Sequence, residues 1–480
     1  MHGWNLELLV QEVLDIQDPS FSFFPLPNSK QYYHPFPSFL PSFLPSFLPS
    51  LIHFVFMTTN NMLTLHSHGD RLVPITTTIA ESLVEQWQTQ LLPYDVPIVL
   101  DLSCRVWRKE CLDVLREFLQ QSIVHRIHTL KIDDIIAGLV TEEGLASLSF
   151  FNDVFGSSST SSSLEVLHLD DNALGIRGIE LLRDLLQLPH TLTLENTGLS
   201  KESLLVLQVR PDLQAIRLGR NQIGPQGAQV VGTLLPQWQQ LQVLHYNGCR
   251  PLEQGTKAIC QGLAEQTRAN PHVRDINVMD SELKSGDDPE HPIHDLCAAI
   301  AQSPHLEALN VVDCSLQPDG LELLLTALTK SKAQLTSLKV SGNELEVEGM
   351  ERLTQYLLQH PTVQCLELAT NEIEHEGLVQ LLPYLQQTTS LRELNLSENL
   401  LETEAVQLLL QHKIANLETF ILTETEMTRK QVQQLRAMYP NVVIDEEDLL
   451  EDDDDDDDDE DERDDQDIDD LAAQLEKAAL

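Results

Sequence analysis

One asparagine in this chain is out of register with its counterparts. The stretch LTLENTGLSK, residues 192–201, places Asn196 one position before Thr197, which occupies the place where similar stretches have asparagine. In those stretches the place holds Asn172, Asn221, Asn343, Asn371 and Asn399. A side-chain amide donates and accepts hydrogen bonds at the same time, so it can fix the orientation of another polar group. Asn196 is therefore the first candidate for chemistry directed outside the fold.

Arg220 occupies the same place as Asn196 in the next stretch, LGRNQI, where it precedes Asn221. A residue at that place leaves a short strand as the backbone turns, so we expect its side chain to face a rim of loops. Arg220 is a candidate for a charged contact. An ordinary polar surface residue is the alternative interpretation for both Asn196 and Arg220.

Motifs for enzymatic chemistry are absent from the sequence. It has no GxxxxGK followed by Ser or Thr, no GxGxxG that opens a helix and no GxSxG. His375 and Glu376 lack the second histidine of a metalloprotease motif, and the other histidines lack metal-ligand spacing. We therefore expect no cofactor, no metal site and no enzymatic activity of the chain itself.

The charge of the chain is strongly negative. The net charge of -45 excludes general binding to nucleic acid or to a membrane surface, because phosphate groups repel such a field. Residues 445–470 hold 21 Asp or Glu against one Arg, and such a block repels itself and is expected to be disordered. The tail, residues 445–480, either keeps the protein soluble or attracts a basic partner.

Seven scattered cysteines without CxxC spacing predict reduced thiols in a cytosolic or nuclear protein, with neither a zinc site nor disulfides. Cys249 and Cys314 fall at the asparagine place, where a buried thiol is a simple substitute.

The first 75 residues do not fit the pattern of the rest. Residues 35–56 are apolar, but a proline at every fourth position argues against a membrane-spanning helix. No basic segment directly precedes a clean apolar core, which argues against a signal peptide. The PSFL repeat is interpreted as translated upstream sequence, with Met57 or Met62 as the true start, and an unusual targeting extension is the alternative.

A frame LxxLxLxxN recurs along the chain, followed each time by a loop and an amphipathic segment. Two divergent units lie at residues 98–107 and 127–136. Clearer frames begin at Leu164, Leu213, Leu241, Val273, Leu306, Leu335, Val363, Leu391 and Leu417. The spacing predicts about a dozen leucine-rich repeats over residues 76–444.

Each unit has a clear physical interpretation. Apolar residues at places one, four and six of the frame point into the interior, and a short parallel strand runs between them. The asparagine at place nine can bond backbone groups of the turn that would otherwise be buried without partners. In residues 178–188, Ile179, Leu182, Leu185 and Leu186 fall on one face of an expected helix.

The fold class is therefore α/β, a leucine-rich repeat solenoid shaped as a horseshoe, with a concave parallel sheet and convex helices. Repeats near 28 residues have room for a full helix. Such a solenoid offers an extended surface and a rim of loops, which favours protein binding over small-molecule catalysis.

Several blocks, in this order, resemble the Ran GTPase-activating protein family. They are IVLDLSCRVW, DDIIAGLVTEEG at 133–144, FNDVFGSSSTSSSLEVLHLDDNALGIRG at 151–178, LTLENTGLSK, LGRNQI, and the acidic run closed by LAAQLEKAAL. The resemblance covers most of the chain after about residue 95.

The resemblance implies an activator of the small GTPase Ran, acting on its GTP form in nucleocytoplasmic transport. Such an activator docks on the switch regions and orients the catalytic glutamine of the GTPase without an arginine finger. The family asparagine maps to Asn196, with Arg220, Asp134 and Asp171 as partner contacts. Ran-binding accessory proteins are further expected partners, and the expected location is cytoplasmic or perinuclear.

The chain departs from the family where an arginine usually follows glycine. Here the pair is Gly138-Leu139, so no guanidinium comes from that position. If the family arginine contributes substantially to binding, this chain is expected to be a weaker activator; if that arginine is peripheral, little changes.

Two other functions remain open. A non-catalytic leucine-rich repeat scaffold that binds other proteins is the first, because the fold alone does not fix function. An acidic nuclear protein that binds histones through its tail is the second, although such proteins use shorter repeats.

Overall fold

The computed structural model describes residues 62–67, 69, 73–91, 96–156, 163–207, 210–284, 286, 288–445 and 449–450. The chain divides into two units, Met1–Thr58 and Thr59–Leu480, and all described residues belong to the second. The expected upstream sequence before Met57 and nearly all of the expected tail, residues 445–480, lie outside the described residues.

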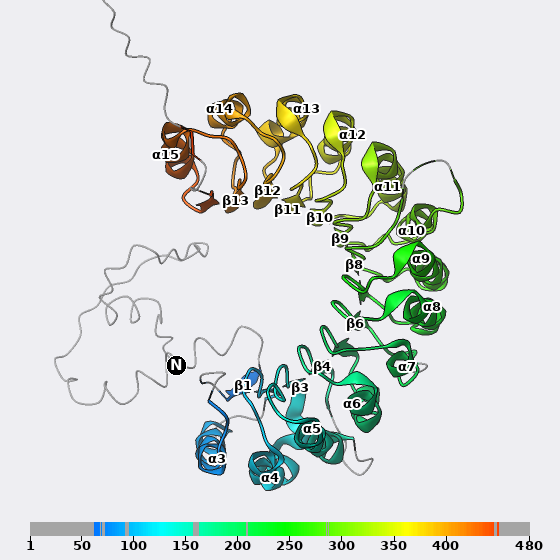
Figure 1. Ribbon diagram of the computed structural model, residues 1–480, viewed down its shortest axis with the longest axis vertical. Coiled ribbons are helices and arrows are strands. Elements are labelled where there is room, and N and C mark those ends of the chain that lie inside the picture. The colour runs from blue at the N-terminus through cyan, green and yellow to red at the C-terminus, as the bar shows by residue number, and fades with distance from the viewer. Residues whose placement is uncertain are drawn as a thin grey trace, which may run out of the picture. The chain divides into compact units, whose positions relative to one another are not determined.

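The described residues form one 14-stranded parallel sheet in which spatial order equals chain order. The strands follow one another along an arc, with the helices outside it (Figure 1). The strands are β1 (Leu63–His66), β2 (Ile98–Asp101), β3 (Ile127–Lys131), β4 (Val166–His168), β5 (Thr191–Thr193), β6 (Ala215–Arg217), β7 (Val243–His245), β8 (Asp275–Asn277), β9 (Ala308–Asn310), β10 (Ser337–Lys339), β11 (Cys365–Glu367), β12 (Glu393–Asn395), β13 (Thr419–Ile421) and β14 (Val442–Val443).

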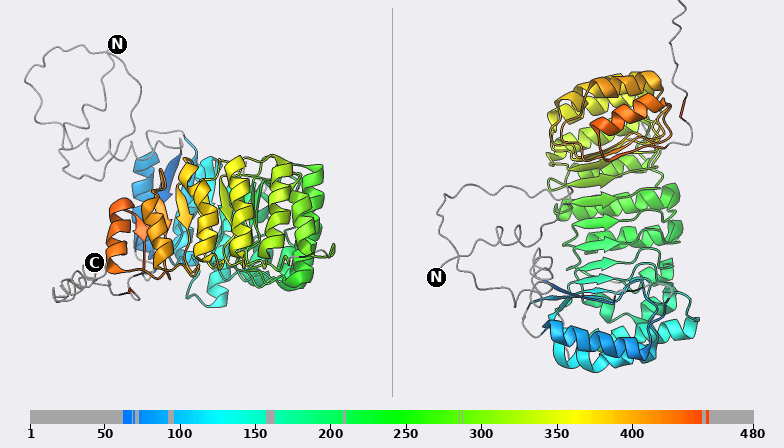
Figure 2. Two further views of the ribbon diagram at one scale, coloured as in Figure 1. Left: turned by 90° about the horizontal axis from the view of Figure 1, so that it is seen from above. Right: turned by 90° about the vertical axis from the view of Figure 1, so that its left-hand side faces the viewer.

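The helices lie on the convex side, as rungs behind the strands (Figure 2). They are α3 (Thr77–Leu91), α4 (Lys109–Phe118), α5 (Thr141–Phe155), α6 (Gly175–Leu181), α7 (Lys201–Leu204), α8 (Gly224–Leu234), α9 (Leu252–Ala269), α10 (Pro292–Ile300), α11 (Gln317–Ser331), α12 (Glu346–Gln359), α13 (Glu374–Gln387), α14 (Thr403–Gln411) and α15 (Arg429–Met438). Short helical turns are η2 (Leu119–Ile123), η3 (Val124–Arg126), η4 (Leu185–Gln187) and η5 (Leu235–Gln237). None of the helices in the described ranges is both long and apolar enough to span a membrane. The predicted α/β leucine-rich repeat solenoid is thus confirmed.

The sheet begins earlier than residue 76, where we expected the repeats to start. In β1, Leu63 and Leu65 are buried and align with Ile98 and Leu100 of β2. The segment LTLH alternates apolar and polar residues over four positions, which is enough for a half-buried strand. The boundary is corrected to Leu63, because this strand covers the open edge of β2.

The helices behind β4 and β5 are shorter than expected. We predicted a continuous helix over residues 178–188, but α6 ends at Leu181 and the turn η4 follows. The units that begin at Leu164 and Pro189 are 25 and 24 residues long, so they have less chain for the convex side. The apolar residues predicted to face the core are nevertheless buried: Ile179, Leu182, Leu185 and Leu186.

The place-nine asparagines bond the turns, as predicted. Asn172 is fully buried, its Oδ1 accepts from the backbone N–H of Ile135 at 3.0 Å, and its Nδ2 donates to the carbonyl oxygen of Ile132 at 2.7 Å. The same place holds buried thiols at Cys249 and Cys314, each directed at a carbonyl oxygen of the preceding repeat. These side chains tie each turn to its neighbour and so fix where every strand ends.

Candidate functional site

Every turn that follows strands β2 to β13 begins with a residue in the left-handed backbone region. These place-eight residues have φ between 50° and 66°, and we call their row the strand-end rim. They are Cys104, Asp134, Asp171, Asn196, Arg220, Gly248, Asp280, Asp313, Gly342, Thr370, Glu398 and Glu424. Such a conformation is uncommon outside glycine and turns the chain sharply. The repeated conformation supports the prediction that place eight marks the departure from the strand.

Asn196 lies exposed on this rim, while its neighbour Thr197 is buried. The Thr197 hydroxyl donates to the carbonyl oxygen of Leu194 at 2.9 Å, and the Thr197 N–H donates to Oδ1 of Asn221 at 2.9 Å. Thr197 therefore substitutes for the usual buried asparagine, and the Asn196 side chain is not needed to close the turn.

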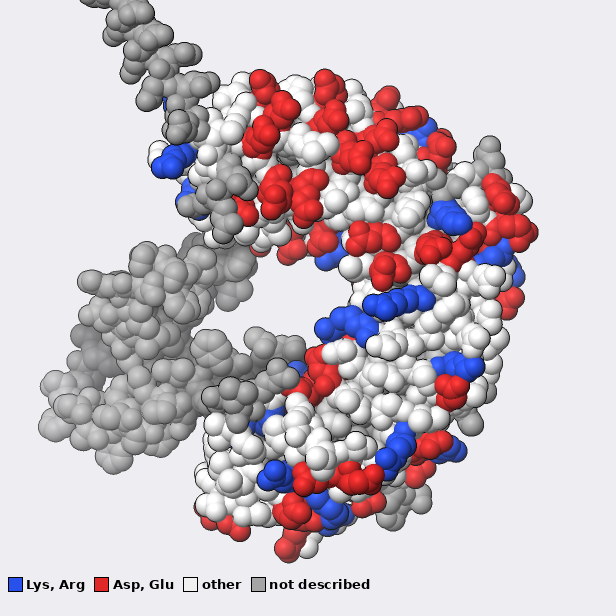
Figure 3. Space-filling view, viewed as in Figure 1, with Lys and Arg blue, Asp and Glu red and all other residues white. Residues whose placement is uncertain are grey.

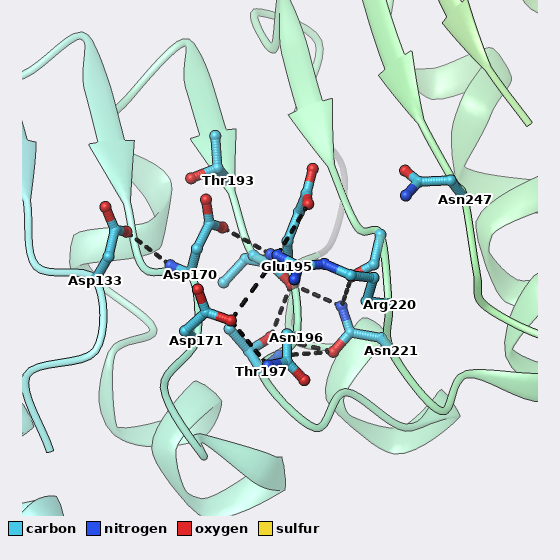
Figure 4. A network of polar contacts seen from close by, with 12 residues as sticks. Asp133, Asp170, Asp171, Thr193, Glu195, Asn196, Thr197, Arg220, Asn221 and Asn247 are labelled. Carbon is cyan, nitrogen blue, oxygen red and sulfur yellow. Dashed lines mark hydrogen bonds and ion pairs between the residues drawn. The ribbon is translucent and has the colours of Figure 1, made fainter. Parts of the chain in front are cut away.

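The amide of Asn196 has a defined orientation. Its Nδ2 donates to Oδ1 of Asp171 at 2.8 Å (Figure 4). A carboxylate only accepts hydrogen bonds, so the amide nitrogen must face Asp171 and the amide oxygen faces away from it. Asn196 thereby presents a hydrogen-bond acceptor at the exposed rim.

Arg220 completes a charged group around Asn196. Its Nη2 lies 3.4 Å from Oε2 of Glu195 and 3.8 Å from Oδ1 of Asp171. Asp171 therefore faces both the amide of Asn196 and the guanidinium of Arg220. We call Asp171, Glu195, Asn196 and Arg220 the rim cluster. The structure brings together three of the four predicted site residues.

Asp134 does not share this exposed arrangement. It occupies place eight of its own repeat but is only 6% exposed. A side chain so buried offers little surface to a partner, which argues against the expected role of Asp134 as a partner contact.

A chain of acidic residues at place seven supports the cluster from the concave side. Oδ1 of Asp133 accepts from the backbone N–H of Asp170 at 2.8 Å, and Oδ1 of Asp170 accepts from that of Glu195 at 2.7 Å (Figure 4). Our sequence reasoning did not single out these carboxylates. The signal was available, because the consecutive pairs DD, DD and EN occupy places seven and eight of three adjacent repeats.

A metal ion is the first ligand to consider near this chain of acids, because single ligand atoms of Asp133, His168 and Asp170 lie within 4.8 Å of one another. Both carboxylates, however, already accept backbone N–H groups. Burial and then the nearby Lys131 ammonium lower the pKa of His168, which keeps its imidazole neutral, but the same ammonium would repel a cation. We therefore assign these residues to positioning of the turns.

Replacing Asp133 with asparagine is expected to flatten the pH dependence of stability. Burial raises the pKa of Asp133 from its ordinary 3.8 to about 7, and the Asp170 carboxylate adds to the rise. Between these values the unfolded chain has lost the proton that the folded chain keeps, so the free energy of unfolding falls as pH rises from about 4 to 7. Asparagine keeps an acceptor for the Asp170 N–H but does not titrate. Urea denaturation of both proteins from pH 4 to 8 measures this, and parallel profiles would contradict it.

Acidic side chains gather over the repeats of α11 to α14 in Figure 3, whereas both signs of charge are mixed over the earlier repeats. On the strand-end rim and the loops beside it, the exposed acidic residues of these later repeats are Glu344, Glu346, Glu372, Glu374, Glu398, Glu402, Glu424 and Glu426. This side of the rim is suited to a basic partner surface.

Comparison with known proteins supports the repeat class. A family model described as Leucine Rich repeat matches residues 302–325 and 333–353. The chain is 30% identical to the ribonuclease inhibitor of Mus musculus over 180 residues, 36% of this chain and 37% of that protein. It is 30% identical to the ribonuclease inhibitor of Sus scrofa over 207 residues, 41% of this chain and 43% of that protein. The chain thus spans less than half the length of these relatives.

Among solved structures, the chain is similar to the crystal structure of the Rad7 and Elc1 complex in yeast. The TM-score is 0.46 at 14% sequence identity, over 83% of this chain and 87% of that chain. The fold is that of a leucine-rich repeat solenoid, and the sequence matches are to a leucine-rich repeat model and to parts of ribonuclease inhibitors.

Proposed function

We propose that this protein activates GTP hydrolysis by the small GTPase Ran, binding its GTP form along the strand-end rim. The observation that carries the proposal is the outward amide of Asn196, held by Asp171 at 2.8 Å. Asn196 is also the residue onto which the resemblance to Ran GTPase-activating proteins maps the family asparagine. The hydrolytic site itself belongs to the GTPase.

The orientation of the amide suggests how it acts. With its nitrogen committed to Asp171, the Asn196 oxygen can accept a hydrogen bond from the side-chain NH₂ of a glutamine on the GTPase. The glutamine oxygen then faces the opposite direction, where it can accept a hydrogen bond from the attacking water and so orient it. Phosphoryl transfer depends mainly on such positioning and on charge stabilisation.

Arg220 is proposed to act as a fixed charge at the interface. Its guanidinium lies against Glu195 and Asp171, and this pairing compensates its charge on the rim. An inserted arginine finger would have to leave both carboxylates. The arrangement therefore favours a mechanism in which the activator positions the glutamine and supplies no catalytic cation.

Replacing Asp171 with alanine is expected to lower the saturated rate of stimulated hydrolysis roughly tenfold. This factor corresponds to the free energy that one hydrogen bond to a charged group usually contributes. The amide of Asn196 would lose the acceptor that orients it. Asp171→Asn keeps an acceptor and should restore part of the rate. Single-turnover rates at several activator concentrations separate this effect from weakened binding. Equal rates for the alanine and asparagine variants would contradict the positioning role.

The first test of the proposal is single-turnover hydrolysis by GTP-loaded Ran with and without the full chain. We expect a stimulation of about 10³- to 10⁵-fold, the range of activators of this kind. An absence of stimulation by a folded chain would reject the proposal.

The second candidate is a protein-binding scaffold without effect on hydrolysis. The matched relatives favour it, because both are inhibitors of a ribonuclease by name. A scaffold would bind a partner with no change in the rate of GTP hydrolysis, which the same experiment detects.

A further inference from the structure

An open hollow lies on the rim beside the cluster. Its volume is about 360 Å³, and its walls come from the turns after β3 and β4. Leu139, Val140 and Ile176 contribute to the walls, and Asp171 lies among the lining residues. This volume is at the low end of the range of about 300–1,000 Å³ typical of small-molecule sites. It suits one inserted side chain better than a cofactor.

The walls expose more apolar surface than the fold requires. Val140 is 65% exposed and Ile176 is 40% exposed, although they belong to different repeats. Single exposed apolar residues are common on protein surfaces. Two that converge on one hollow resemble the centre of a protein interface, where a few buried apolar contacts supply most of the affinity.

Ion pairs involve Arg177, which lines the hollow, and Glu142 and Glu143, which follow the lining residue Thr141 in the chain. Arg177 lies 2.9 Å from Glu142, and Arg108 lies 3.8 Å from Glu143. These charges compensate each other, so the hollow needs no charged group from a partner. An apolar centre with a polar border is the usual composition of a protein–protein contact.

The hollow is continuous with the rim cluster. Asp171 lines the hollow and also accepts the hydrogen bond from Asn196. A protein surface that reaches the Asn196 amide would therefore also cover the hollow. Leu139, at the position where the family resemblance leads one to expect arginine, makes this part of the rim apolar.

We propose that the hollow receives one apolar side chain of the GTP-bound GTPase, an inference that rests on the proposed function. Burial of this side chain against Leu139, Val140 and Ile176 contributes to affinity and leaves the hydrolytic step unchanged.

Val140→Asp is the variant that tests this contact. Val140 precedes α5 with extended backbone, φ −67° and ψ 151°, at the position where aspartate caps helices well. The exposed side chain also contributes little to the core. The variant should therefore fold, and it places a charge in the apolar hollow. Val379→Asp is the matched control, because Val379 lies on the convex helix α13 and is 42% exposed.

The experiment is single-turnover hydrolysis by GTP-loaded Ran over a range of concentrations of the full chain. We expect Val140→Asp to raise the half-saturating concentration about tenfold with an unchanged saturated rate, as for loss of an interface hot spot. Val379→Asp should match the parent chain. An unchanged half-saturating concentration for Val140→Asp would overturn the inference.

A second measurement distinguishes failure of the inference from failure of the proposed function. Calorimetry of the parent chain and of Val140→Asp with Ran bound to a non-hydrolysable GTP analogue gives affinity without catalysis. Weaker binding of Val140→Asp supports the hollow as a contact even if the parent chain stimulates no hydrolysis. Equal binding by both chains overturns the hollow alone, and no binding by the parent chain overturns both proposals.

Discussion

Asn196→Ala is expected to lower the saturated rate of stimulated GTP hydrolysis by about 10²- to 10³-fold, the loss typical for removal of one positioned polar group in a reaction centre. Asn196 is exposed, and the buried hydrogen bonds of its turn are made by Thr197 and Asn221. The free energy of unfolding should therefore fall by no more than about 1 kcal/mol, from alanine in a left-handed conformation. Single-turnover kinetics and urea denaturation measure the two effects.

Two further variants separate the amide from the backbone. Asn196→Gly removes the side chain and suits the φ of 52°, so it should lose the same stimulation without strain. Thr370→Ala changes an exposed residue at place eight of a distant repeat, with a φ of 55°, and should keep full stimulation. Near-parental stimulation by both Asn196 variants would reject the mechanism.

Asn221→Ala is expected to affect stability instead of catalysis and to lower the free energy of unfolding by about 3–5 kcal/mol. Asn221 is 2% exposed, and its Oδ1 accepts from the N–H groups of Thr197 and Leu199 at 2.9 and 3.0 Å. Its Nδ2 donates to the carbonyl oxygens of Leu194 and Leu218 at 2.6 and 2.7 Å. Alanine would leave these buried backbone groups without partners.

Urea denaturation gives the stability loss, and hydrogen exchange locates it at the turns after β5 and β6. Asn196→Ala serves as the control. It removes the same kind of side chain from the preceding turn, but the Asn196 side chain is exposed and, among the described residues, makes no buried hydrogen bonds to the turn. A loss below about 1 kcal/mol for Asn221→Ala would show that water replaces the missing bonds. The two asparagines, in adjacent turns, thus separate an effect on hydrolysis from an effect on folding.

The repeat architecture was predictable because its signal is periodic. Leucines at places one, four and six recur often enough to define strands, and the buried asparagines at place nine explain why the strands end together. The outward direction of Asn196 followed from counting within this frame. The position of Thr197 at place nine predicted that the fold does not use Asn196.

Features that depend on contacts between repeats were not predictable from one frame. The burial of Asp134 depends on the packing of neighbouring turns, which the frame does not specify. The contact between Asn196 and Asp171 joins residues 25 positions apart, and it exists because adjacent turns are in register. The early strand β1 was missed because four residues carry little periodic signal.

The left-handed residues of the rim have a geometric consequence. Each stands at the same point of its repeat, and neighbouring strands of a parallel sheet lie about 4.8 Å apart. The rim therefore presents one side chain per repeat at regular spacing. These side chains can be exchanged while the buried place-nine residues keep the turns in place. Moving an Asp–Asn pair to the next repeat would displace the proposed docking site by one such step, about the spacing of two neighbouring strands.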